Sequence, residues 1–216
     1  MTTRRVFSLL FLAFLSASSH AYSITSFPSS AYNVDTNVMN STLGIDGTYV
    51  VEDFEDSTLI AGLTITDHAD GIGSPSSVSN AVIVWDGSTA MAAGLGPAHP
   101  IDDPIFSFSQ TVMRFGIGIS DYQSAFYGLT QILVNGTNIG AIPFDDTLRD
   151  GYLFITAGNG EGINSVTFLQ SNNDAIMYDH LAVQYAAVPI PSSLLLMGLG
   201  ILVFRTAQRR RILITA

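Results

Sequence analysis

Apolar residues recur at short intervals through the middle of the chain, and they alternate with small or polar residues instead of following a helical period. The clearest case is the run in which Phe115, Ile117 and Ile119 are separated by Gly116 and Gly118. A period of two is typical of a β-strand with one buried face. Glycine on the other face predicts that another layer packs closely there.

A tight hairpin is predicted at residues 131–140, where Asn135-Gly136 lies between two apolar runs. Asn-Gly favours positive φ at both turn positions, which matches the twist of paired strands. Further short strands are predicted at residues 81–85, 152–157, 166–169 and 175–184. Residues 22–40 are expected to form a loosely held segment or an edge strand.

Eight or nine short strands at this spacing predict an all-β fold. We expect a single antiparallel β-sandwich or jelly-roll domain over residues 22–187, flanked by an N-terminal signal peptide and a C-terminal transmembrane helix.

The first 21 residues have the three parts of a secretory signal peptide. Arg4 and Arg5 give the positive start, residues 6–17 are almost entirely apolar, and Ser19-His20-Ala21 supplies small residues at a cleavage site. The apolar run is too short to span about 30 Å of hydrocarbon, so we expect residues 1–21 to be removed. The alternative is an anchor that is kept.

The other end has a proline motif, an apolar stretch and a cluster of arginines. As a helix, residues 188–204 would be about 25 Å long, and the predicted transmembrane helix covers about residues 192–204. Arg205 can reach the interface, and the basic residues that follow the apolar run predict that their side faces the cytoplasm. The preceding domain would then lie outside.

This tail, over residues 188–211, resembles the PEP-CTERM sorting signal, and residues 212–216 form a short extension after it. The residues that carry the resemblance are Val188, Pro189, Ile190, Pro191, Arg205, Arg209, Arg210 and Arg211. Two features depart from the family pattern: Ile190 stands where the family usually has Glu, and the extension follows the arginines, where the family usually stops.

The resemblance implies an exported protein of a Gram-negative bacterium. Such a protein is anchored in the inner membrane through its C-terminal helix, is then processed by an exosortase, a membrane protease, and ends at the cell surface or secreted. The alternative is an ordinary C-terminal anchor that is never processed.

The middle of the chain is similar to the extracellular β-sandwich modules common in this sorting family. The similarity rests on residues 54–56, 112–117, 164–168 and 176–181. It implies that the late strand with the pattern I-x-x-D-x-L lies beside an early strand.

The charge distribution narrows the function classes. The net charge is −10, and only Arg114 and Arg149 lie between residues 22 and 187, together with all 18 acidic residues. A nucleic-acid partner is excluded, because neutralising phosphates requires a basic surface. The absence of cysteine excludes a disulfide scaffold and a cysteine-ligated zinc site.

A calcium site is predicted from Glu52, Asp53 and Asp179. Asp179 shares strand parity with Leu181, so it is expected on the apolar side, where a carboxylate needs a partner. Ca²⁺ takes about six to eight oxygen ligands, and Glu52 or Asp53 would join Asp179 if the first and last strands are neighbours. The alternative is a solvated acidic face, with Asp179 bonded to loop amides. No other cofactor is expected.

Exposed aromatic rings would bind sugars by stacking, and Trp85, Tyr122 and Tyr127, with the neighbouring Phe126, are the residues predicted for that role. The alternative for each is packing in the core. The sequence has no H-E-x-x-H, G-x-S-x-G or P-loop motif and no cysteine nucleophile, so we expect no enzyme activity.

The resulting hypothesis is an exported, non-catalytic protein of the cell surface or extracellular matrix. The alternatives are a carbohydrate-binding module for exopolysaccharide, with calcium as a stabiliser, and a secreted hydrolase.

Overall fold

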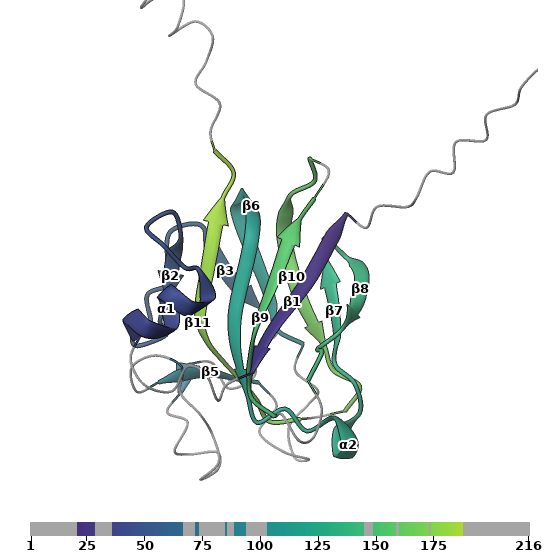
Figure 1. Cartoon of the computed structure of the whole chain (residues 1–216). Helices are drawn as coiled ribbons and strands as arrows, with labels where there is room; N and C mark the ends of the chain where they lie inside the picture. The colour runs from purple at the N-terminus through teal and green to yellow at the C-terminus, as the bar shows by residue number, and fades with distance from the viewer. Residues whose placement is uncertain are drawn as a thin grey trace, which may run out of the picture. The chain divides into compact units, whose positions relative to one another are not determined.

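The computed structural model describes residues 21–28, 36–66, 72–73, 85, 89–93, 103–144, 149–158, 160–172 and 174–187 (Figure 1). The chain divides into two units, Met1–Tyr185 and Ala186–Ala216. The predicted signal peptide, apart from Ala21, and the predicted sorting tail lie outside the described residues, and so does the predicted transmembrane helix. In the described ranges, no helix combines the length and apolar character required to span a bilayer.

The domain is mostly antiparallel β-sheet, which confirms the predicted fold class. Its described elements are β1 (Tyr22–Pro28), α1 (Thr36–Leu43), β2 (Val50–Glu52), β3 (Leu63–Thr66), β4 (Ile72–Gly73), β5 (Ala90–Ala93), β6 (Ile105–Ser120), α2 (Ser124–Tyr127), β7 (Gln131–Val134), β8 (Thr137–Ala141), β9 (Gly151–Ala157), β10 (Ile163–Leu169) and β11 (Ile176–Tyr185). The two short helices were not predicted. Of the predicted strand at residues 81–85, only Trp85 is described, and it lies in a bend.

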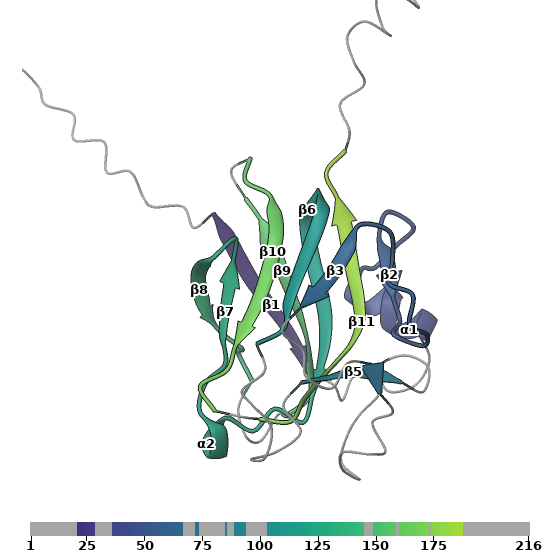
Figure 2. The ribbon, with the colours of Figure 1, turned by 180° about the vertical axis from the view of Figure 1, so that it is seen from behind.

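The long strand β6 connects the two parts of the sheet. Its first half pairs with β3 and β10, and its second half pairs with β9 and β11. The strand order is β4-β5-β11-β6-β10-β7-β8, with β1 added through β9. The sheet therefore folds back on itself and nearly closes, so that its edge strands β1 and β8 lie near each other (Figure 2). Residues of both strands line a groove.

The main core fills the inside of this folded sheet. Phe106 lies at its centre, with edge-to-face contacts to Phe115, Phe168 and Tyr178 at ring-centroid distances of 5.7, 6.0 and 6.0 Å. All four side chains are fully buried. Aromatic pairs in this geometry add about 0.5–1.5 kcal/mol each beyond the burial of their area.

A second, smaller core lies on the outer face of β6. A Cβ at Gly116 would lie 2.4 Å from Cε1 of Phe154, and one at Gly118 would lie 2.4 Å from Cδ1 of Trp85. The predicted close approach of another layer is thus confirmed. Helix α1, which lies beside β11 and β2 in both views (Figures 1 and 2), adds Met39 and Leu43 to this cluster.

Helix α1 forms because it packs against the sheet, although its residues have a low intrinsic helix propensity. Most of its residues are Thr, Asn, Ser or Val, which form helices poorly in isolation. Met39 and Leu43 lie four positions apart, so both fall on one face of the helix. Both are buried, with exposed fractions of 1% and 3%. The helix is therefore held by its contact with the sheet.

A β-bulge in β11 changes the predicted position of Asp179. Asp179 pairs with Gly118 and Ala182 with Gly116, so two residues, His180 and Leu181, lie opposite one residue of β6. His180 has φ 46°, and this extra residue reverses the side-chain alternation beyond it. Asp179 is buried but shares the outer face with Gly118, not the inner face with Leu181. The parity prediction was wrong because sequence spacing does not reveal a bulge.

Two predicted strand contacts are confirmed. Strands β7 and β8 form the hairpin, with φ values of 50° at Asn135 and 78° at Gly136. The late strand β11 lies beside the early strand β2, with Leu181 opposite Glu52. The first part of residues 22–40 is the predicted edge strand, β1.

We predict that Gly118→Ala destabilises the domain by about 1–3 kcal/mol, because the new methyl group would overlap the Trp85 ring. Urea unfolding measures this change. Gly47→Ala is the control, since a Cβ at Gly47 meets nothing within 4 Å. Equal stability of Gly118→Ala and the control would contradict the close packing of β6 against Trp85.

Candidate functional site

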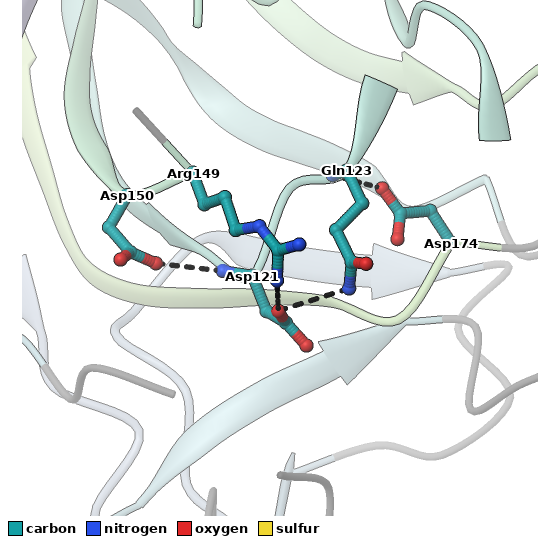
Figure 3. A network of polar contacts seen from close by, with 5 residues as sticks. All are labelled: Asp121, Gln123, Arg149, Asp150 and Asp174. Atoms are coloured by element: carbon teal, nitrogen blue, oxygen red, sulfur yellow. Dashed lines mark hydrogen bonds and ion pairs between the residues drawn. The ribbon is translucent and has the colours of Figure 1, made fainter. Parts of the chain in front are cut away.

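The candidate site lies at the end of the domain where α2 follows β6 (Figure 1). Three chain segments meet there: the turn after β6, the start of β9 and the start of β11. Each brings one aspartate, respectively Asp121, Asp150 and Asp174, and Figure 3 shows these three with Gln123 and Arg149.

The three carboxylates hold the turns together. Oδ1 of Asp150 accepts a hydrogen bond from the backbone N–H of Asp121 at 2.9 Å. Oδ2 of Asp174 accepts one from the backbone N–H of Gln123 at 2.8 Å. The Gln123 side chain then donates to Oδ1 of Asp121 at 3.1 Å, and Nη1 of Arg149 lies 3.6 Å from the same oxygen (Figure 3).

Asp174 is the most unusual of these groups. It is only 1% exposed, and its Oδ1 finds no hydrogen-bond partner among the described residues. Burial raises the pKa of Asp174 to about 6, while the hydrogen bond from Gln123 opposes this increase. This carboxyl therefore changes between its protonated and ionised forms around pH 6.

The pKa values of Asp121 and Asp150 are also raised, in both cases chiefly by burial. The Arg149 guanidinium opposes the increase at both residues, and the Asp150 carboxylate adds to it at Asp121. In the ranges that the structure covers, no three His, Cys, Asp or Glu side chains form a group able to hold a metal ion. The hydrogen bonds that Asp150 and Asp174 accept from the backbone tie the turn after β6 to the segments before β9 and β11.

Apolar side chains project from the same end. Phe126 is 72% exposed and Leu129 is 52% exposed, and Tyr127 between them is half-buried. The chain that carries them is fixed: Ser171 Oγ donates to the Leu129 carbonyl at 2.6 Å, and Asn172 Nδ2 donates to the Tyr127 carbonyl at 2.9 Å. We call Phe126, Tyr127 and Leu129 the α2 surface.

Two of the predicted sugar-stacking residues are core residues. Trp85 is 6% exposed and packs edge-on against Tyr152, with 5.7 Å between ring centroids. Tyr122 is fully buried, and its hydroxyl accepts a hydrogen bond from the Thr130 N–H at 3.2 Å. Neither ring offers a face to solvent, so the stacking prediction is wrong for both. Tyr127 stays a prediction, as part of the α2 surface.

The predicted calcium ligands are neighbours through the pairing of β2 with β11, but backbone amides bond their carboxylates. Glu52 accepts hydrogen bonds from the N–H groups of Phe54 at 3.0 Å and Ile60 at 2.7 Å. Asp179 accepts them from Trp85 and His180, each at 2.7 Å. Asp53 is exposed and accepts one from Glu55 at 3.1 Å. The bond from Trp85 matches the part of the alternative in which Asp179 bonds loop amides, but Glu52 and Asp179 are buried and so do not form a solvated acidic face.

The aspartate network was missed by sequence reasoning. Asp121, Asp150 and Asp174 are far apart in the chain and share no spacing that suggests a site. The order of β6, β9 and β11 in the sheet brings them together. Each lies at the end of a predicted strand, which is the one signal that the sequence offers.

No protein-family model matches the chain, and no curated protein matches it significantly. Among solved structures, the K2 cleaved adhesin domain of Lys-gingipain is similar over 62% of this chain and 98% of that chain, with 13% identity and a TM-score of 0.41.

The catalytic unit of the thermostable GH87 alpha-1,3-glucanase from Streptomyces thermodiastaticus strain HF3-3 is similar over 66% of this chain and 27% of that chain, with 16% identity and a TM-score of 0.35. A GH87 alpha-1,3-glucanase catalytic domain in complex with tetrasaccharides is similar over 67% and 29%, with 12% identity and a TM-score of 0.35. At these values none of the three similarities carries an argument about function.

We predict that stability falls as the pH rises from about 4 to about 6. The folded-state pKa of Asp174 is about 6 and the unfolded value is about 3.9, so in this window the folded state binds more protons than the unfolded state. Deprotonation therefore costs stability, and the loss is complete above the folded pKa. Asp174→Asn should remove the part of this slope that Asp174 contributes, leaving the parts from Asp121 and Asp150, whose pKa values are also raised. It should raise the free energy of unfolding at pH 7.5 by about 1–2 kcal/mol.

Urea unfolding at pH 4.5 and 7.5 measures the effect. Asp46→Asn is the matched control, because Asp46 is exposed and hydrogen bonds from Thr48 lower its pKa. The control should keep the slope between pH 4 and 6. If Asp174→Asn keeps it as well, burial of Asp174 is not its source.

Proposed function

We propose that this chain is an exported, non-catalytic protein of the bacterial cell surface or extracellular matrix, and that it binds other molecules through its α2 surface. The observation that carries this proposal is that polar and apolar side chains have different roles at the α2 end. The carboxylates of Asp121, Asp150 and Asp174 are tied to the turns, and the side chains that project are apolar. A rigid end with apolar projections suits binding more than acid–base chemistry.

Export and sorting are supported by the two ends of the sequence. The first 21 residues have the pattern of a signal peptide, and residues 188–211 resemble a PEP-CTERM signal. The first compact unit of the chain ends at Tyr185, just before that pattern begins at Val188. The tail is then free to serve as the substrate of an exosortase in a Gram-negative envelope. A jelly roll is the finer fold that we propose for the domain.

A carbohydrate-binding module for exopolysaccharide is the second candidate function. The exposed ring of Phe126 beside the half-buried ring of Tyr127 favours it. Sugar rings stack on aromatic faces, and one such contact with an exposed ring would contribute about 1 kcal/mol to the free energy of binding.

We predict that changing Arg209, Arg210 and Arg211 together to Ala leaves the tail uncut in the native host. A basic cluster fixes the orientation of the apolar stretch in the membrane, and it is part of the pattern that a sorting protease would read. Mass spectrometry of the mature C-terminus in envelope and medium is the measurement. Thr215→Ala, outside the cluster, is the control and should be processed normally. Normal processing of the triple variant would count against the sorting proposal.

We predict that Phe126→Ala weakens sedimentation of the protein with insoluble exopolysaccharide from its own host by about 3- to 10-fold, because the exposed ring is lost. Val38→Ala is the matched control, since Val38 is 50% exposed but lies on α1. If both variants sediment equally well, the α2 surface does not bind the carbohydrate. If the unchanged protein does not sediment at all, the second candidate function is wrong.

A further inference from the structure

The α2 surface does not explain a groove that lies between the two edge strands. It has a volume of about 780 Å³, which lies within the range of roughly 300–1,000 Å³ typical of ligand sites. Its lining residues come from the start of β1, from the β7–β8 hairpin and from the loop before β10: Ala21, Tyr22, Ser23, Ile24, Asn135, Thr137, Asn138, Ile139 and Glu161.

The walls of the groove are held by two asparagines. Asn135 Nδ2 donates to the Tyr22 hydroxyl at 2.8 Å and to the Gly162 carbonyl at 2.7 Å, and its Oδ1 accepts from the N–H groups of Asn164 and Ser165 at 2.8 and 3.1 Å. Asn138 bridges Gln131 and Gly140 at 3.2 and 2.9 Å. A ligand would therefore meet a site that is already formed, which lowers the entropy cost of binding.

Two polar side chains in this groove are available to a ligand. Thr137 and Glu161 are exposed, and in the described part of the chain nothing forms a hydrogen bond or ion pair with their side chains. Ser23 also lines the groove, but its side chain points to the face of β1 opposite Ile24. Ile24 and Ile139 line the groove too and are partly buried against the main core. The site thus combines an apolar floor with hydroxyl and carboxylate groups at the rim.

The charge of the groove selects the class of ligand. Among the described residues that line it there is no lysine or arginine, and Glu161 is the one charged residue. Phosphate, sulfate and uronate groups would be repelled there, and the net charge of −10 adds to this repulsion. Hydroxyl-rich neutral ligands fit better, because sugar hydroxyls both donate to carboxylates and accept from hydroxyls.

The geometry disfavours an added β-strand in the same groove. A Cβ at Gly140 would lie 3.7 Å from Cδ1 of Ile24, so the two edges are nearly in contact at that point. The register of β8 shifts between Asn138 and Gly140, and the Gly140 N–H is bonded by the Asn138 side chain. A peptide running along β8 would find neither space beyond Ile24 nor a regular row of free amides.

We infer that this groove binds a neutral oligosaccharide, with Thr137 and Glu161 contacting its hydroxyls and with Ile24 and Ile139 against the sugar ring. This site is separate from the α2 surface and does not depend on it.

Isothermal titration of the full chain with cellohexaose and maltohexaose, and with a hexamer of galacturonic acid for comparison, tests the inference. We expect binding of at least one neutral hexamer and none of the acidic one. Thr137→Trp should block the groove and reduce binding at least 10-fold. Thr137→Val and Glu161→Gln should each weaken binding by about 3- to 10-fold, the effect of one hydrogen bond.

Thr25→Trp is the matched control, because Thr25 is exposed on β1, does not line the groove and points to the face opposite Ile24. It should bind as the unchanged protein does, and so should Phe126→Ala. Thermal melting of every variant checks that the fold is kept. Binding lost in Phe126→Ala but kept in Thr137→Trp would overturn the inference, as would binding of the acidic hexamer in preference to both neutral ones or no binding of any hexamer.

Discussion

The structure depends on one strand, β6, that presents large side chains on one face and almost none on the other. Phe115, Ile117 and Ile119 point into the main core, whereas Gly116 and Gly118 leave space for the rings of Phe154, Tyr152 and Trp85. Because both faces of β6 are covered, the strand lies at the centre of two cores. It also pairs with β3, β10, β9 and β11, so it fixes the positions of most other strands.

The second constraint is the shortage of basic residues. With only Arg114 and Arg149 between residues 22 and 187, ion pairs can neutralise few of the buried acids, although Arg149 lies beside Asp121. Glu52, Asp179 and Asp174 accept hydrogen bonds from backbone N–H groups instead. Glu52 and Asp179 each tie a loop to a strand, and Asp174 ties the turn before α2 to the segment before β11. Arg114 itself is used in the outer core, where its guanidinium carbon lies 3.9 Å from the centre of the Phe154 ring.

The α2 end and the β1–β8 groove therefore present different kinds of surface. At the α2 end the carboxylates are bound to turns, and the apolar side chains of the α2 surface project into solvent. In the β1–β8 groove the apolar side chains are partly buried, and the polar side chains are exposed. Asn135 connects β1, the hairpin and the start of β10, and therefore keeps this groove open and rigid.

The sequence by itself determined the fold class, the Asn135-Gly136 hairpin, the glycine face of β6 and the pairing of a late strand with an early one. These follow from local spacing and turn chemistry, which act over a few residues. The tertiary structure alone decided the face of Asp179, because the bulge at His180 shifts the alternation of β11. It also decided the burial of Trp85 and Tyr122, the meeting of Asp121, Asp150 and Asp174, and the groove between β1 and β8. Each of these depends on contacts between residues distant in the chain, for which local patterning carries no information.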